Sequence, residues 1–118
     1  MYRFAQEQIE KWIAARRRKP LIVRGARQVG KTWLIEQVAA KGFETLVKVD
    51  LEKRRDLHFV FGDNLDPKAI LRHLEVDSGR RIVPGNALLF LDEIQACPRA
   101  IMALRYFFEQ MPELHVIA

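Results

Sequence analysis

The stretch that decides the fold is Gly25-Ala26-Arg27-Gln28-Val29-Gly30-Lys31-Thr32. It follows the apolar run Leu21-Ile22-Val23, and residues 33–41 after it have the composition of a helix. Glycines allow the backbone to curl so that successive N–H groups point inward, and the positive end of the helix dipole faces the same point. The order of strand, glycine-bounded loop and helix therefore predicts a loop that binds the phosphates of a nucleotide, with the Walker A pattern.

Each residue of this loop has an expected role. The backbone amides that would surround the phosphates are those of Gly25, Ala26, Arg27, Gln28, Val29 and Gly30. Lys31 would reach the β- and γ-phosphates and assist the reaction, and the Thr32 hydroxyl would bind Mg²⁺. The alternative is a glycine-rich turn that binds nothing, but the flanking strand and helix favour the nucleotide site.

A second informative stretch is Ala87-Leu88-Leu89-Phe90-Leu91-Asp92-Glu93. A continuous apolar run that ends in acids is typical of a fully buried parallel strand whose carboxyl end opens on a site. We expect Asp92 to contribute to the Mg²⁺ site, as the acid of a Walker B strand does, and Glu93 to act as general base for the attacking water. The alternative is a pair of solvated acids. Gln95 could hydrogen-bond near the γ-phosphate or cap the loop.

Length and composition limit the other possibilities. The chain has 118 residues, which we interpret as one domain, and a single cysteine, Cys97, which excludes an internal disulfide. It has no run of 18 apolar residues and no apolar signal segment, so we expect a cytoplasmic protein with no membrane span. The net charge is +5, and the basic cluster Arg16-Arg17-Arg18-Lys19 fits either a nucleic-acid contact or a solvated helix end.

The remaining sequence predicts alternating helices and strands. Residues 2–18 form an amphipathic pattern ended by Pro20, and Trp12 in it could stack on a base, although burial in the core is favoured. Residues 43–51 alternate as a strand does, after a possible C-cap at Gly42.

Two further helices are predicted, and the first has clear boundaries. Asp66 is a suitable N-cap before Pro67, and this helix stops by Ser78-Gly79. The other helix begins at Pro98 and has two neighbouring apolar stripes: Ile101, Leu104, Phe108 and Met111 on one, and Ala100, Ala103 and Phe107 on the other. The last residues, 114–118, begin a further strand. The three histidines show no metal-ligand spacing.

The order of the motifs is similar to that of a known family. Arg24 followed by the phosphate loop, then Leu91-Asp92-Glu93-Ile94-Gln95, then a helix and an apolar strand, resembles predicted prokaryotic AAA-type ATPases. The resemblance covers essentially the whole chain. It implies that Lys31 and Thr32 bind phosphate and Mg²⁺, and that Asp92 and Glu93 do the Walker B work. It also implies a C-terminal domain of unknown function in most members.

The resemblance further implies the order of the strands in the sheet, and it shows where this chain departs from the family pattern. The strand after residue 113 is expected between the phosphate-loop strand and the Asp92 strand. A sensor residue, an arginine finger and a fifth strand would follow Ala118, so residues 1–118 are interpreted as the N-terminal part of a P-loop domain truncated before its last strand or strands. An uncovered edge of the phosphate-loop strand would favour self-association or docking of the missing C-terminal domain, and hydrolysis would be slow.

The sequence therefore predicts an α/β P-loop domain, a three-layer sandwich with a mostly parallel sheet. It would bind ATP with Mg²⁺ and hydrolyse the ATP. ATP is preferred over GTP on the resemblance alone. The alternatives are a small-molecule kinase, a nucleotide-dependent switch that does not hydrolyse, and a nucleic-acid module that uses the basic cluster.

Overall fold

A parallel sheet forms the centre of the molecule. The computed structural model describes residues 2–14, 20–21, 28–62 and 64–118, and the side chains of all of these except 2–6 and 28–31. Three strands lie in the order β1 (Thr45–Asp50), β2 (Ala87–Asp92) and β3 (His115–Ile117), and all pair in parallel. Leu21 forms a parallel bridge to Ile117, so the segment that leads into the predicted phosphate loop lies beyond β3. This is the strand order that the resemblance implied.

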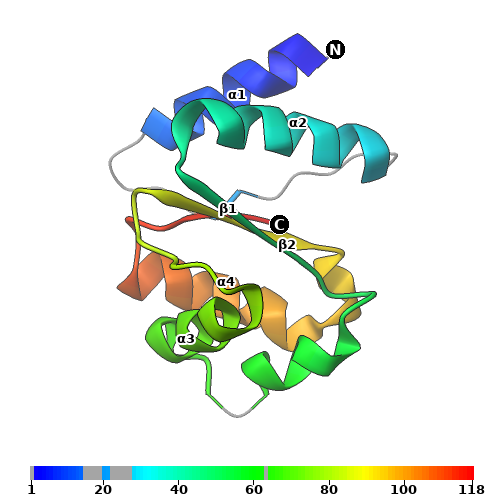
Figure 1. The fold of residues 1–118 in the computed structure, drawn as a ribbon, viewed down its shortest axis with the longest axis vertical. Coiled ribbons are helices and arrows are strands. Elements are labelled where there is room, and N and C mark those ends of the chain that lie inside the picture. The colour runs from blue at the N-terminus through cyan, green and yellow to red at the C-terminus, as the bar shows by residue number, and fades with distance from the viewer. Residues whose placement is uncertain (1, 15–19, 22–27, 63) are drawn as a thin grey trace.

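Helices cover both faces of the sheet (Figure 1). One face carries α1 (Tyr2–Ala14) and α2 (Gln28–Gly42), and the other carries α3 (Pro67–Ser78) and α4 (Pro98–Gln110). Two short 3₁₀ helices, η1 (Arg55–Phe61) and η2 (Ile94–Ala96), follow β1 and β2. The predicted three-layer α/β sandwich with a parallel sheet is therefore confirmed.

Strand β2 supplies both halves of the core. All six of its residues are buried, as its unbroken apolar sequence predicted. Successive side chains of a strand point to opposite faces. Leu88 and Phe90 accordingly pack in the cluster under α1 and α2, whereas Leu89 and Leu91 pack in the cluster under α3 and α4.

The ends of α3 follow the predicted chemistry. The Asp66 carboxylate accepts a hydrogen bond from the Lys68 amide at 3.3 Å, and Pro67 is the first helical residue. Gly79 ends the helix in the left-handed conformation, with φ 70°, which a residue without Cβ adopts at little cost. Helix α4 likewise begins at Pro98, as predicted.

Three boundary predictions were wrong or incomplete. Helix α2 begins at Gln28 rather than after Thr32, although Gly30 disfavours a helix by about 1 kcal/mol relative to alanine. Gly42 is the last helical residue of α2 and not a left-handed cap, and β1 is shorter than residues 43–51. The predicted continuation of α1 to residue 18 lies outside the described residues.

The buried stripe of α4 differs from the first predicted stripe. Ala100, Ala103, Leu104 and Phe107 are buried, whereas Ile101 is 47% exposed. The small side chains of Ala100 and Ala103 allow the helix to approach its neighbours closely, so the face that contains them packs inward.

Candidate functional site

Strand β2 ends in a buried carboxylate. Asp92 is 2% exposed, and its Oδ1 accepts a hydrogen bond from the Glu93 amide at 3.0 Å. A buried carboxylate is costly unless other groups satisfy it. The structure thus confirms the predicted burial of this strand end and excludes a fully solvated Asp92.

Glu93 follows in an unusual backbone conformation. Its φ of 54° and ψ of 47° lie in the left-handed region, and it is the non-glycine residue with positive φ among those that the structure describes. This conformation costs about 1–2 kcal/mol for a residue with Cβ. Such residues are concentrated at functional sites, where the surrounding structure holds them in place. The Glu93 side chain is half-buried.

Leu21, which precedes the phosphate-loop sequence, lies in the same sheet as β2. The Leu21 amide donates to the Val116 carbonyl at 2.8 Å, and the Leu21 carbonyl accepts from the Ala118 amide at 2.8 Å. Leu21, β3 and β2 are parallel, and β2 ends in Asp92 at the carboxyl edge of the sheet. Among the described residues β3 lies between Leu21 and β2, so the backbones of Leu21 and Phe90 are about 10 Å apart at strand spacings of roughly 4.8 Å.

Helix α2 begins at this edge too. Its last residues lie near the amino edge, since Phe43 donates to Ala39 and the Glu44 amide donates to the carbonyl of Asn86, the residue before β2. Its 15 residues span about 22 Å, similar to the roughly 20 Å of a six-residue strand. The helix lies on the sheet through Leu34, Ile35, Val38 and Ala39, so its N-terminus reaches the carboxyl edge.

The first turns of α2 contain part of the predicted phosphate loop. Gln28, Val29, Gly30, Lys31 and Thr32 are helical, and Thr32 is half-buried. The first amides of a helix have no intrahelical partner and carry the positive end of its dipole. Of the other predicted residues, Gly25, Ala26 and Arg27 lie outside the described residues.

The structure gives the contacts of two further polar residues of this edge, of which the sequence had singled out only Gln95. Asp50 is the register partner of Asp92, but its Oδ1 accepts from the amides of Glu52 and Lys53 at 3.0 and 3.1 Å and so caps a turn. Gln95, for which two roles were open, donates its side-chain Nε2–H to Oε1 of Glu93. In the sequence, the signal for the contact between Gln95 and Glu93 was that they lie two positions apart in Glu93-Ile94-Gln95.

Trp12 packs at the other end of the sheet. Its ring meets His115 edge-on, with ring centroids 5.3 Å apart, and Phe43 meets His115 in a similar way at 4.8 Å. His115 is the first residue of β3, and its Nε2 lies 3.1 Å from the Ile13 carbonyl oxygen. The structure therefore favours the core role for Trp12 over base stacking.

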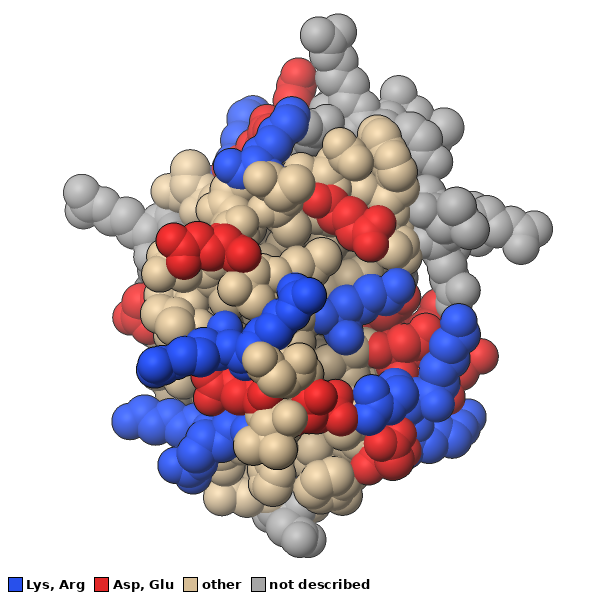
Figure 2. All heavy atoms as spheres, viewed as in Figure 1, with Lys and Arg blue, Asp and Glu red and all other residues tan. Residues whose placement is uncertain are grey.

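Basic residues are mixed with acidic ones on the face shown in Figure 2. Arg54 forms ion pairs with Asp56 at 3.0 Å and Asp77 at 2.7 Å, and hydrogen bonds to both raise the pKa of its guanidinium. Arg80 donates to the Leu46 carbonyl at 3.1 Å. These two arginines are thus engaged within the fold, and the cluster Arg16-Arg17-Arg18-Lys19 lies outside the described residues.

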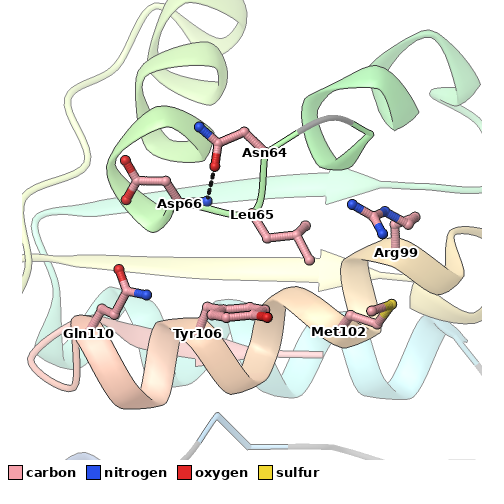
Figure 3. A pocket seen from close by; sticks show the side chains of 7 residues that line it. All are labelled: Asn64, Leu65, Asp66, Arg99, Met102, Tyr106 and Gln110. Atoms are coloured by element: carbon pink, nitrogen blue, oxygen red, sulfur yellow. Dashed lines mark hydrogen bonds between the residues drawn. The ribbon is translucent and has the colours of Figure 1, made fainter.

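A surface hollow on the α3–α4 side is separate from this edge (Figure 3). It has a volume of about 400 Å³, and the residues lining it are Asn64, Leu65, Asp66, Arg99, Met102, Tyr106 and Gln110. Its two charged residues have structural partners: Arg99 donates to the carbonyls of Phe61 and Gly62 at 3.0 Å, and Asp66 caps α3. Among the described residues, no three metal-ligating side chains gather, and no helix is long and apolar enough to cross a membrane.

Comparison with known proteins identifies the family. A family model described as an AAA domain matches residues 17–118. The chain belongs to this family. Searches of curated proteins and of solved structures gave no match. Membership in the AAA domain family supports a nucleotide-binding, ATPase-like character, in agreement with the parallel α/β fold.

Proposed function

We propose that this domain binds ATP together with Mg²⁺ and hydrolyses the ATP. The observation that supports this most strongly is the strand order. Since the Leu21 segment, β3 and β2 are parallel neighbours, the start of α2 and the buried Asp92 share the carboxyl edge of the sheet. Ligands of open α/β sheets bind at this edge.

The residues present suit a magnesium nucleotide. Mg²⁺ is usually bound by one or two protein oxygens together with phosphates and water, so a protein cage of three carboxylates is not required. Asp92 and the Thr32 hydroxyl are oxygen donors of this type. When bound, Mg²⁺ would neutralise part of the charge on the β- and γ-phosphates. Lys31 would hold the same phosphates, and the amides of residues 25–30 would surround them.

Glu93 is the proposed general base. A carboxylate within hydrogen-bond reach of a water can orient it and accept its proton as the water attacks phosphorus. Glu93 directly follows the buried Asp92 and is half-buried, and its backbone is held in a strained conformation. These features distinguish it from the exposed acids elsewhere on the surface, such as Glu36 and Glu113.

Calorimetry with MgATP tests the phosphate site. Lys31→Ala should weaken binding about tenfold or more, because a hydrogen bond to a charged group is lost. Lys41→Ala is the matched control, since Lys41 is the basic residue in the last turn of the same helix. Equal affinities for the wild type and Lys31→Ala, with both proteins folded by circular dichroism, would contradict the proposal.

Hydrolysis is tested separately with Glu93→Gln. This variant should bind MgATP as the wild type does. It should release phosphate at least about 10²-fold more slowly, because the base is removed. Glu36→Gln, on the exposed side of α2, serves as the control. Unchanged, slow turnover in Glu93→Gln would instead favour a nucleotide-dependent switch.

A further inference from the structure

The turn that follows β2 is held by hydrogen bonds of its backbone amides and carbonyls. The Glu93 amide donates to Oδ1 of Asp92 at 3.0 Å, and the Glu93 carbonyl accepts from the Ala96 amide at 3.0 Å. The Cys97 amide then donates to the Ile94 carbonyl at 2.9 Å, and the buried Cys97 leads into α4. Bonds on both sides thus fix the backbone of Glu93.

The side chain of Glu93 has a restraint as well. Gln95, on η2, donates its Nε2–H to Oε1 of Glu93. An ionised carboxylate only accepts hydrogen bonds, so the amide group must present its NH₂ side to Glu93. Gln95 itself is exposed. Its replacement would therefore remove little packing and would act mainly on the Glu93 carboxylate.

We infer that Gln95 is a positioning residue, which holds the Glu93 carboxylate in a fixed orientation through this hydrogen bond. The inference rests on the proposed function, in which Glu93 acts on the attacking water. Supporting partners of this kind commonly contribute 10–100-fold to activity.

The first test uses the nucleotide-free protein and needs no activity. The side-chain NH₂ protons of Gln95 are followed by NMR and assigned by their loss in Gln95→Ala. Glu93→Ala should shift one of these protons and speed its exchange with water, because the carboxylate that accepts its hydrogen bond is removed. Glu36→Ala, at an exposed acid of α2, is the control and should leave both protons unchanged.

The second test measures ATP turnover. Gln95→Ala should lower kcat about tenfold and leave KM for ATP within about twofold, because the base is misplaced while the phosphate site is intact. A raised KM with unchanged kcat would overturn the inference and place Gln95 at the phosphates instead.

The two proposals fail in different ways. Unchanged Gln95 side-chain NH₂ signals in Glu93→Ala, in a protein whose turnover is abolished by Glu93→Gln, would overturn the positioning role and leave the proposed function intact. A folded wild-type chain that neither binds nor hydrolyses MgATP would overturn the proposed function, and the positioning role with it.

Discussion

Strands β1 and β2 lie side by side, have the same length and both end in aspartate. Their register pairs Thr45 with Ala87 and Asp50 with Asp92. However, every residue of β2 is buried, whereas β1 buries only Val47 and Val49. The difference arises because β2 lies between two strands and under helices on both faces, while β1 has a neighbouring strand on one side only within the part of the chain that the structure describes.

The two aspartates at the ends of these strands differ in burial in the same way. Asp50 is half-buried and uses its Oδ1 to cap the turn at Glu52 and Lys53. Asp92 is buried and leads into the strained Glu93. Two acids at the same level of one sheet thus have different surroundings, and only the acid on the central strand is a strong candidate for a ligand role.

The largest expected effect comes from the register pair Phe90 and Lys48. Phe90→Ala should lower the free energy of unfolding by about 3–5 kcal/mol, because it leaves a cavity in the cluster under α1 and α2. Lys48→Ala, on the exposed edge strand, should change it by less than about 0.5 kcal/mol. Urea denaturation measures both. Similar losses would mean that β1 is covered in solution, for example by a second copy of the chain.

Next comes the pair of aspartates. Asp92→Asn should lower Mg²⁺-dependent ATP turnover about 10–100-fold, the range for residues that support a metal site. Asp50→Asn should leave turnover within about twofold, because the Asn oxygen can still cap the turn. Phosphate release at several Mg²⁺ concentrations distinguishes them. If Asp50→Asn had the larger effect, the assignment of Asp92 would be wrong.

A smaller effect is expected at the edge of β1. Arg80 donates to the Leu46 carbonyl and so covers part of the free edge, which could otherwise pair with another chain. Arg80→Ala should reduce stability by less than about 1 kcal/mol and increase self-association with concentration. Sedimentation measures the latter, with Arg81→Ala as the control. Identical behaviour of the two variants would show that Arg80 does not protect this edge.

The smallest effect concerns the acid stability of η1, which follows β1. The hydrogen bond from Arg54 lowers the pKa of the exposed Asp56 below its ordinary value of 3.8. Its stabilisation is therefore complete above that value and is lost as the pH falls through the ordinary and then the lowered pKa. Asp56→Asn should lose less stability than the wild type between about pH 5 and 3. Parallel losses in urea denaturation would exclude a contribution from this pair.

Much of the fold was predictable because local chemistry determines it. Asp66, Pro67 and Gly79 fix the ends of α3 through capping and backbone preference, and the unbroken apolar run of β2 requires burial on two faces. The inward face of α4 was less predictable, because two adjacent apolar stripes compete. Only the packing of Ala100 and Ala103 excludes Ile101 from the core.

For the candidate site too, part could be predicted from the sequence and part could not. The residue types of the phosphate loop and of Asp92-Glu93 indicated the chemistry from the sequence, and residues 17–118 match the AAA domain family. The strand order inferred from that resemblance is confirmed by the bridge between Leu21 and Ile117. The role of each site residue stays a prediction that the variants above test.

The sequence by itself determined the order of helices and strands, the ends of α3 and the chemical classes of the site, because these depend on side chains close together in the chain. The tertiary structure decided which aspartate is buried, which stripe of α4 faces inward, and what Gln95 contacts. Those outcomes depend on which strand lies in the centre of the sheet and how the chain turns after it. Both are set by contacts between segments far apart in the sequence, such as Leu21 with Ile117.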